Sequence, residues 1–375
     1  MPRLVALDLP AGPAFVAALE AAWEAGDAVL PLDPRLPEPA TRRILEHLRP
    51  AVIVDEDGQT ELDGDIPTEE GDALVLATSG TTGDPKGVVL TAAAVDASAR
   101  ATSTALGVDP ARDRWVACLP LSHVGGLTVL VRALLTGTPY RLHPRFVPTD
   151  VEREAAEGAT LVSLVATALG RTDVSRYRAV LLGGAAPPSG LPANVVTTYG
   201  ATETGSGIVY DGRPLPGVEV RIGDGVTGAS GEVLVRGPML LRCYRDGSDP
   251  KTGDGWLPTG DGGEIMPDGT LRVDGRLADV IVTGAEKVWP AAVEAVLAHH
   301  PGVAEVAVWK RPDAEWGERV VAWVVPTDPA TPPLLGELRT LAAETLAPWA
   351  APKELVVTDR LPRTAIGKVR RRQLR

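Results

Sequence analysis

The N-terminal half of the chain alternates short apolar runs with segments of helical spacing. Helical spacing occurs at residues 13–25 and 91–106, and Thr91 is placed to cap the second helix. The apolar runs, each bounded by turn residues, lie at 28–34, 73–78, 115–121, 161–169, 179–184 and 195–200. Strands that alternate with helices predict a mainly parallel sheet, and the predicted fold class is therefore α/β.

The pattern changes beyond residue 207. Short alternating runs such as VEVRIGDG, GEVLVRGP and GTLRVDGR predict antiparallel hairpins in a small β subdomain. A compact α+β set follows, with a helix at 290–300, strands at 303–310 and 319–326, and a helix at 334–346. We therefore expect a boundary near 276–279, between an N-terminal domain of residues 1–276 and a C-terminal domain of residues 277–375.

Composition and charge narrow the classes of protein. A chain of 375 residues exceeds one ordinary domain of about 100–200 residues, and 44% hydrophobic residues can form a sizeable core. The net charge of −12 argues against nucleic acids and membranes as partners, because both favour a basic surface. Cys118 and Cys243 lie outside any CxxC spacing, and no apolar run approaches a membrane span. We expect a soluble cytoplasmic protein, whose oligomeric state, a homodimer included, stays open.

A glycine-rich segment, TSGTTGDPKG, follows the apolar run that ends at Thr78. Its small residues let the backbone approach an anion, its N–H and hydroxyl groups can donate hydrogen bonds, and Lys86 adds a positive charge. It does not match the pattern GxxxxGK(S/T), and a surface turn would also favour Gly, Asp and Pro. Hydroxyls and glycines directly after a buried strand favour a polyphosphate site. Its predicted residues are Thr78, Ser79, Gly80, Thr81, Thr82, Gly83 and Lys86.

In this loop the sequence resembles the adenylate-forming superfamily of acyl-CoA synthetases and non-ribosomal adenylation domains. Further motifs occur in that superfamily's order from about residue 28 to 372. The resemblance implies a large N-terminal α/β body with a small antiparallel β subdomain, followed by a small mobile α+β C-terminal domain. It also implies ATP, Mg²⁺ and CoA as ligands and a small-molecule carboxylic acid as substrate. Little chain precedes the phosphate loop, so we expect a shortened N-terminus.

A second motif, Tyr-Gly-Ala-Thr-Glu-Thr, lies at residues 199–204, at the end of a predicted strand. Tyr199 offers a flat face for a base, Thr202 a hydroxyl for a phosphate, and Glu203 a hard oxygen ligand for Mg²⁺. From the residues alone, an ordinary strand-to-helix turn is an equal alternative. The resemblance implies that Tyr199 stacks on adenine, that Thr202 contacts the α-phosphate and that Glu203 helps to bind magnesium. It also implies an adenine-binding segment at Gly183, Gly184 and Ala185.

Two further positions acquire roles only through the resemblance. Asp261 and Arg276 lie in compositions that are common in hairpins, but the superfamily's matching residues contact the ribose. The hinge between the domains lies two positions after that arginine. The chain has Ala278 there, where the superfamily usually has Asp or Lys. The position at which the hinge stops in each state therefore does not follow from the resemblance.

The C-terminal domain carries two motifs for two different steps. Gly284 resembles the glycine that lines the pantetheine tunnel, where a side chain would obstruct the thiol of CoA. Lys368 resembles the catalytic lysine that contacts the substrate carboxylate and the α-phosphate, so the predicted catalytic set is Thr202, Glu203 and Lys368. A solvated basic tail is the alternative, because residues 360–375 hold seven basic residues and no acidic one. The resemblance implies that this domain rotates between the two half-reactions.

The prediction of the acid depends on resemblance in a few short segments. PLDPRLP, LLGGAAP and residues 198–206 resemble the o-succinylbenzoate-CoA ligases of menaquinone biosynthesis. The predicted pocket for the acid or for CoA comprises His123, Gly200, Thr204, Ser206 and Gly284. For Thr204 and Ser206, a structural role in the turn is nearly as well supported. Three alternatives stay open: another aryl- or acyl-CoA ligase, a standalone adenylation domain that loads a carrier protein, and a non-catalytic nucleotide-binding sensor.

Overall fold

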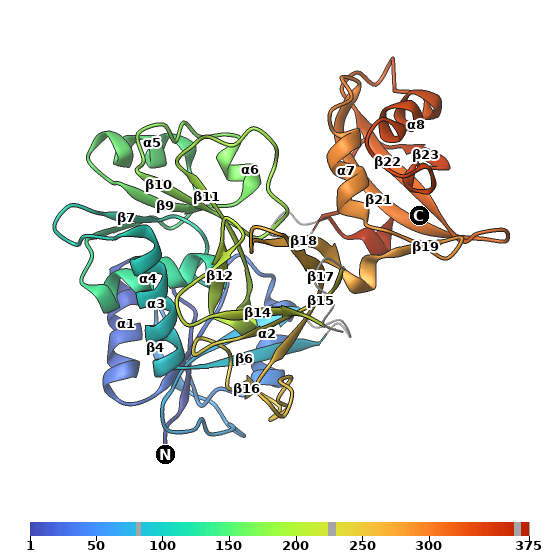
Figure 1. The fold of residues 1–375 in the computed structure, drawn as a ribbon. Helices are drawn as coiled ribbons and strands as arrows, with labels where there is room; N and C mark the ends of the chain where they lie inside the picture. The colour runs from blue at the N-terminus through green and yellow to red at the C-terminus, as the bar shows by residue number, and fades with distance from the viewer. Residues whose placement is uncertain (80–83, 224–229, 364–368, 375) are drawn as a thin grey trace. The chain divides into compact units, whose positions relative to one another are not determined.

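The computed structural model describes residues 1–79, 84–223, 230–363 and 369–374, and Figure 1 shows its course from the N-terminus to the C-terminus. The chain forms two compact units. Unit 1 comprises Met1–Val220 and Val235–Leu257, and unit 2 comprises Arg221–Leu234 and Pro258–Arg375. The predicted boundary near 276–279, between an N-terminal body and a mobile C-terminal domain, stays a prediction.

The first sheet of unit 1 has the strand order β16-β6-β5-β2-β1-β3-β4. Its centre is parallel, through the pairs β1–β2, β1–β3 and β2–β5, and its edge strands pair antiparallel. The strands are β1 (Leu4–Leu7), β2 (Ala28–Pro31), β3 (Val52–Asp55), β4 (Gly58–Glu61), β5 (Asp72–Ser79), β6 (Pro85–Thr91) and β16 (Cys243–Tyr244). β1 and β2 are buried along their whole length, as expected for parallel strands covered on both faces.

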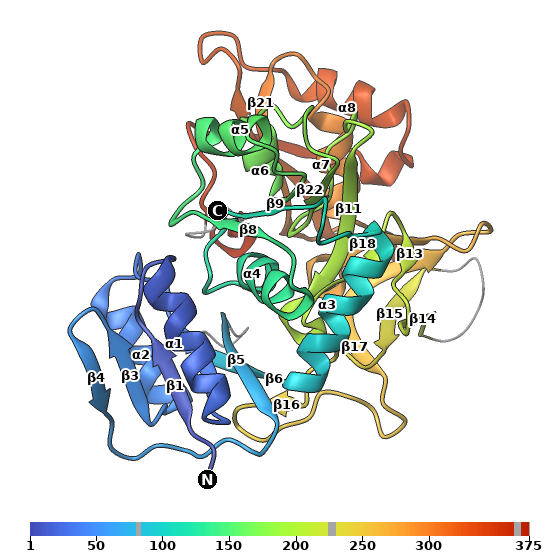
Figure 2. The same cartoon turned by 90° about the vertical axis from the view of Figure 1, so that its left-hand side faces the viewer.

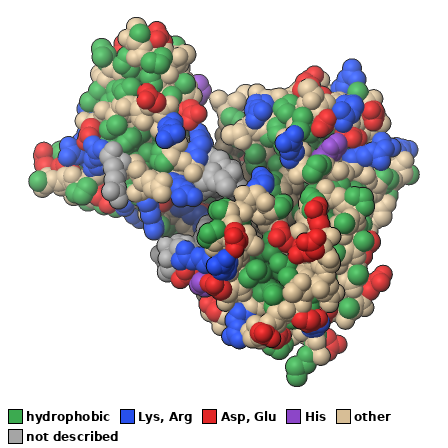
Figure 3. All heavy atoms as spheres, turned by 180° about the vertical axis from the view of Figure 1, so that it is seen from behind, with side chains coloured by type: hydrophobic (Ala, Val, Ile, Leu, Met, Phe, Trp, Pro, Cys, Tyr) green, Lys and Arg blue, Asp and Glu red, His purple; other side chains and the backbone are tan. Residues whose placement is uncertain are grey.

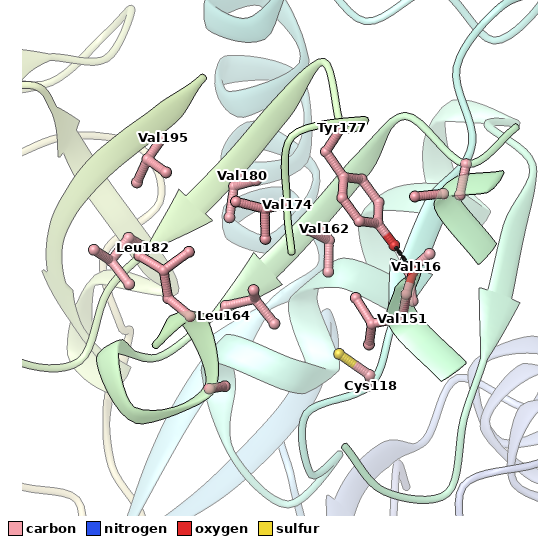
Figure 4. Packing of buried hydrophobic residues seen from close by; sticks show 14 residues of the cluster. Val116, Cys118, Val151, Val162, Leu164, Val174, Tyr177, Val180, Leu182 and Val195 are labelled. Carbon is pink, nitrogen blue, oxygen red and sulfur yellow. Dashed lines mark hydrogen bonds between the residues drawn. The ribbon is translucent and has the colours of Figure 1, made fainter. Parts of the chain in front are cut away.

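The second sheet of unit 1 has the order β13-β12-β11-β10-β9-β7-β8, with a parallel run from β8 to β11. Its strands are β7 (Trp115–Ala117), β8 (Tyr140–Leu142), β9 (Leu161–Leu164), β10 (Ala179–Leu182), β11 (Val195–Ala201), β12 (Ser206–Tyr210) and β13 (Arg213–Pro214). Figure 4 shows the core on one face, where the Tyr177 hydroxyl donates to the Val151 carbonyl at 2.7 Å. Burial raises the pKa of the Cys118 thiol in this core to about 12, so Cys118 packs there as an apolar group.

Helices cover both sheets of unit 1. They are α1 (Pro13–Glu24), α2 (Glu38–Leu48), α3 (Ala92–Leu106), α4 (Val124–Thr136), α5 (Pro148–Ala156) and α6 (Ala166–Leu169). In Figure 2, α1 and α2 lie on opposite faces of the first sheet. Leu48 of α2 shares a core with Leu4 and Ala6 of β1, the two residues of that strand that face the same side. The two faces of the buried strand β1 therefore each pack against one helix.

Unit 2 contains most of a four-stranded sheet and all of a five-stranded one. The four-stranded sheet has the order β14 (Glu219–Ile222), β15 (Gly231–Arg236), β17 (Leu257–Ile265) and β18 (Leu271–Arg276). The five-stranded sheet has the order β20 (Glu286–Val288), β19 (Ile281–Thr283), β22 (Gly317–Pro326) and β21 (Val303–Asp313), with β23 (Glu354–Val357) paired to β22. Val293 of α7 (Pro290–Leu297) and Leu338 of α8 (Leu335–Ala343) are fully buried against the second of these sheets.

The sequence prediction was wrong at three points. No strand was predicted between the glycine-rich loop and the helix at 91–106, but β6 lies there and returns antiparallel to β5 before the helix starts. The run 161–169 splits into β9 and the short helix α6. The predicted parallel sheet is two sheets, because the edge strands turn back on the parallel cores and break the strand-helix alternation. The predicted helices at 91–106 and 334–346, and the strands of the C-terminal set, are confirmed within a few residues.

Charged side chains of both signs lie side by side on the surface in Figure 3. Many form ion pairs, such as Arg236 with Glu219 and Arg178 with Asp113, both at 2.7 Å. On the face drawn in Figure 3, the charge is therefore mixed and not uniformly acidic. Across the part of the chain that the structure describes, none of the helices combines the length and the apolar character that crossing a membrane requires.

The cap of α3 gives a stability prediction. Thr91 Oγ1 accepts a hydrogen bond from the Ala94 N–H at 3.1 Å. Thr91→Ala should lower the free energy of unfolding by about 1 kcal/mol, the usual loss for an N-cap. Thr91→Ser keeps the hydroxyl and should stay close to wild type in urea denaturation followed by tryptophan fluorescence. Equal stability of the Ala and Ser variants would contradict the capping role.

Candidate active site

The glycine-rich loop connects the two strands of the β5–β6 hairpin. Thr78 pairs with Lys86 across the hairpin, and the Thr78 hydroxyl donates to the Lys86 carbonyl at 3.4 Å. The next residue, Gly87, is closely packed, because a Cβ there would lie 2.8 Å from the Leu48 side chain. The predicted residues Gly80, Thr81, Thr82 and Gly83 lie outside the described residues, and Ser79 is the last residue of β5. The hairpin therefore leaves the Lys86 side chain exposed beside this loop.

The second motif forms a tight turn between β11 and β12. Thr202 and Glu203 lie in the 3₁₀ turn η1 (Thr202–Thr204), half-buried, directly after the strand that carries Tyr199. Gly200 permits the close approach of β12, because a Cβ at this position would lie 2.1 Å from the Ser206 carbonyl oxygen. The turn therefore fixes the position of Glu203 relative to the end of β11.

Thr204 is occupied within this turn. Its side chain is buried, and its hydroxyl accepts a hydrogen bond from the Ala201 N–H at 2.8 Å. The same hydroxyl lies 2.6 Å from the Ser206 carbonyl and 2.9 Å from the Ala201 carbonyl, either of which can accept its proton. These contacts favour the structural alternative for Thr204, and its predicted contact with substrate stays a prediction.

The structure adds one residue that the sequence motifs did not indicate. The Tyr244 hydroxyl donates a hydrogen bond to Glu203 Oε1 at 3.0 Å, and Lys86 Nζ lies 4.8 Å from the centre of the Tyr244 ring. Tyr244 reaches both because β16 pairs with β6, where Tyr244 is opposite Val88. β16 is only two residues long, and so short a strand carries no periodic signal in the sequence.

The predicted adenine-binding segment and Tyr199 lie at the carboxyl ends of neighbouring strands. β10 ends at Leu182 and is followed by Gly183, and it pairs in parallel with β11, which carries Tyr199. A Cβ on Gly183 would lie 2.5 Å from Thr198 Oγ1, and Gly184 has a φ of +86°, which favours glycine. Ala185 follows, exposed. This placement is the one at which open α/β sheets usually bind ligands.

His123 and Ser206 are distant in the sequence, but both lie next to α4. His123 is the residue before α4, and its Nε2 lies 4.0 Å from Asp33 Oδ2. Hydrogen bonds from Arg35 lower the pKa of Asp33, so this carboxylate is anionic at neutral pH. Ser206 Oγ lies 3.3 Å from the Thr128 hydroxyl, one turn into the same helix. Both predicted substrate residues therefore lie near the N-terminal turns of α4.

In unit 2, Asp261 and Arg276 form an ion pair across the β17–β18 hairpin. Arg276 Nε lies 3.0 Å from Asp261 Oδ1, and Arg276 Nη1 donates to the Thr259 carbonyl at 2.9 Å. The register of the two strands thus brings together the two residues for which the resemblance implies contacts with the ribose. The predicted hinge residue Ala278 is exposed in the 3₁₀ turn η2 (Leu277–Asp279).

Gly284 lies in a left-handed conformation, with a φ of +59°, between β19 and β20. A Cβ there would lie 2.7 Å from the ring of Trp316, and the Gly284 N–H donates to the Trp316 carbonyl at 2.9 Å. Trp316 is 42% exposed, and Lys353 Nζ lies 3.8 Å from the centre of its ring. Both the conformation and the close ring favour glycine at this position. Lys368 lies outside the described residues.

The residues fit a magnesium ion only as a partner of a bound nucleotide. Within the described ranges, no group of three or more His, Cys, Asp or Glu side chains is arranged to hold a metal ion. Glu203 offers a hard carboxylate with one oxygen engaged by Tyr244. Mg²⁺ usually binds through one or two carboxylates together with substrate phosphates and water. A single carboxylate that is linked through Tyr244 to an exposed lysine fits that pattern.

Comparison with known proteins agrees with this arrangement. The model of the AMP-binding enzyme family matches residues 64–245, and that of the AMP-binding enzyme C-terminal domain matches residues 292–368. A probable 2-succinylbenzoate–CoA ligase of Mycobacterium tuberculosis is 38% identical over 366 residues, which cover 90% of this chain and 93% of the relative.

Two solved structures extend the similarity to the whole fold. Both are of the o-succinylbenzoate CoA synthetase of Bacillus subtilis, at 31% identity. The complex with the acyl-adenylate intermediate has a TM-score of 0.87 and covers 100% of this chain and 88% of that chain. The complex with ATP and magnesium ion has a TM-score of 0.85 and covers 99% and 89%. The α/β fold class with a C-terminal domain is confirmed, and the chain belongs to the family of AMP-binding, adenylate-forming enzymes.

Proposed function

We propose that this chain is an ATP-dependent 2-succinylbenzoate–CoA ligase, an AMP-forming acid–thiol ligase. It would adenylate the acid and then form the CoA thioester, a step of menaquinone biosynthesis. The observation that carries the proposal is the 38% identity, over 90% of this chain, to the mycobacterial relative of that name. The similarity to a synthetase solved with the acyl-adenylate supports it independently. The grouping of Lys86, Tyr244 and Glu203 supports a nucleotide-phosphate site.

Charge decides what the first half-reaction needs. A carboxylate oxygen of the acid attacks the α-phosphorus of ATP, an oxygen–phosphorus bond forms, and the bond to pyrophosphate breaks. The two reactants are both anions and repel each other, so cationic groups must be placed before they meet. Lys86 supplies one such group. Lys368 supplies another, according to its motif. Glu203 would hold Mg²⁺, which supplies positive charge at the phosphates.

The second half-reaction needs a different set of groups. The thiolate of CoA attacks the carbonyl carbon of the acyl-adenylate, a carbon–sulfur bond forms, and AMP leaves with the bridging oxygen. AMP is a good leaving group, so the requirement here is access for the thiol. Gly284 is assigned to that access. Because Gly284 and Lys368 follow the hinge near 276–279, we propose that residues 277–375 rotate between the two steps, with Ala278 at the hinge.

The nucleotide would be held by residues of several of the predicted motifs. Tyr199 and the segment 183–185 would contact adenine, and their place at the ends of adjacent strands supports this assignment. Asp261 and Arg276 would contact the ribose, and their ion pair supports it by orienting the Asp261 carboxylate. Thr202 would contact the α-phosphate from the start of η1.

The acid would lie near α4. Its second carboxylate requires donors, and the hydroxyls of Ser206 and Thr128 lie together there at 3.3 Å. Ser206 is the better candidate of the two predicted hydroxyls, because that of Thr204 is engaged by its own turn. His123, at the start of α4, would line the same pocket, and Gly200, whose lack of a side chain lets β12 approach, would contribute only its backbone. We also propose a cytoplasmic location, where ATP and CoA are available.

Pyrophosphate exchange into ATP, measured over a panel of carboxylic acids, tests this function. We expect exchange to be strongest with 2-succinylbenzoate and weaker with benzoate, succinate, a fatty acid and an amino acid, and we expect CoA to be acylated. Exchange with another acid alone would indicate a different ligase. An adenylate that does not acylate free CoA would indicate a domain that loads a carrier protein. No AMP with any acid would indicate a nucleotide-binding sensor.

Lys368→Ala should separate the two half-reactions. We expect adenylation to fall by roughly 10²- to 10³-fold, because a preorganised charge at the reacting phosphate is lost. Thioester formation from a synthetic acyl-adenylate and CoA should change far less. Arg360→Ala removes an exposed charge from the same basic segment and serves as the control, with both rates near wild type. Equal loss of both half-reactions in Lys368→Ala would contradict the assignment.

Gly284→Ala should show the opposite selectivity. Its Cβ would lie 2.7 Å from the Trp316 ring, so the segment must shift where the thiol is expected to pass. Thioester formation should fall by roughly tenfold or more, while adenylation stays near wild type. Gly269→Ala is the matched control, because its φ of +81° carries a similar strain but its Cβ would meet nothing within 4 Å. If both variants lose thioester formation alike, strain alone explains the effect and the role of Gly284 is wrong.

A further inference from the structure

Tyr244 contacts two charged residues of the candidate active site at once. Its hydroxyl donates to Glu203 Oε1 at 3.0 Å, while the Lys86 ammonium lies 4.8 Å from the centre of its ring. Glu203 and Tyr244 are half-buried and Lys86 is exposed, so the charged end of Lys86 stays accessible to a ligand. One side chain thus links a carboxylate suited to a metal ion with a lysine suited to a phosphate.

The two contacts act in different ways. A hydrogen bond to one oxygen of a carboxylate limits its rotation and leaves the other oxygen for a cation. The ring attracts the ammonium through its negative face and so restricts the long, flexible lysine side chain. Tyrosine combines both contacts, whereas phenylalanine offers only the second.

Main-chain hydrogen bonds around Tyr244 tie it to the two segments that carry Glu203 and Lys86. The Leu241 N–H donates to the Glu203 carbonyl at 2.8 Å, which ties the segment to η1. The Arg242 N–H donates to the Val89 carbonyl at 2.9 Å and the Arg245 N–H to the Gly87 carbonyl at 2.7 Å, which ties it to β6. The position of Tyr244 is therefore determined from both sides by main-chain hydrogen bonds, and its ring and hydroxyl have a rigid base.

We propose that Tyr244 is a positioning residue for the metal–phosphate part of the nucleotide site. Its hydroxyl orients Glu203 toward Mg²⁺, and its ring holds Lys86 toward the phosphates, so that both act on one nucleotide. The inference rests on the proposed function only in that the ligand is ATP with magnesium. A purely structural tyrosine would stabilise the fold but would have no specific effect on magnesium.

Titration calorimetry with a non-hydrolysable ATP analogue, repeated over a series of Mg²⁺ concentrations, tests the inference without acid or CoA. Tyr244→Phe keeps the ring and loses the hydroxyl. It should raise the Mg²⁺ concentration for half-maximal nucleotide affinity by roughly tenfold, the size of one hydrogen bond to a charged group. At saturating Mg²⁺ its affinity should return to wild type. Tyr244→Leu loses the ring as well, so its affinity should stay reduced at all Mg²⁺ concentrations.

Tyr177→Phe is the matched control. It removes a buried tyrosine hydroxyl that donates to the Val151 carbonyl at 2.7 Å, in the core of the second sheet. It should lower the melting temperature and leave the magnesium dependence unchanged. An unchanged magnesium dependence in Tyr244→Phe, or a uniform loss of affinity at every Mg²⁺ concentration, would overturn the proposal. A magnesium shift in a protein that adenylates no acid would support Tyr244 and refute the ligase function instead.

Discussion

Three main-chain hydrogen bonds from residues 241–245 join the β5–β6 hairpin to the turn that carries Glu203. They run to the carbonyls of Gly87, Val89 and Glu203 at 2.7–2.9 Å. Because β6 belongs to the first sheet and the turn follows β11 of the second, this bridge sets the spacing of groups from two separate sheets. A lysine and a carboxylate that are far apart in sequence are thereby held near one ring. In the proposed reaction, the electrostatic preorganisation for adenylation would depend on this spacing.

Close backbone approaches surround the same region. A Cβ would lie 2.8 Å from Leu48 at Gly87, 2.5 Å from Thr198 at Gly183 and 2.1 Å from the Ser206 carbonyl at Gly200. In each case a side chain would displace a strand or a turn that holds a site residue. These glycines lack the Cβ that would clash, and they therefore let the segments around the candidate site pack closely.

Local signals predicted much of the fold, and long-range pairing explains what they missed. The cap at Thr91, the buried run of β5 and the alternating strands of the C-terminal set depend on nearby residues, and each was recognisable from its pattern. β6 was missed because an apolar run after a glycine-rich loop does not tell whether the chain returns or crosses over. Glu203 and Lys86 were recognised from their motifs as candidate site residues, but Tyr244 was not, because its partners come from distant segments. The hydrogen bonds of the Thr204 hydroxyl could likewise not be predicted, because they depend on the geometry of the turn.

The proposed reaction begins with attack by the acid's carboxylate at the α-phosphorus of ATP. Its most direct test uses 2-succinylbenzoate labelled with oxygen-18 in its carboxyl groups, turned over with ATP and CoA, and mass spectrometry of the products. The account predicts AMP that carries an oxygen-18 atom and pyrophosphate that carries none. Unlabelled AMP, or label in pyrophosphate or phosphate, would contradict it.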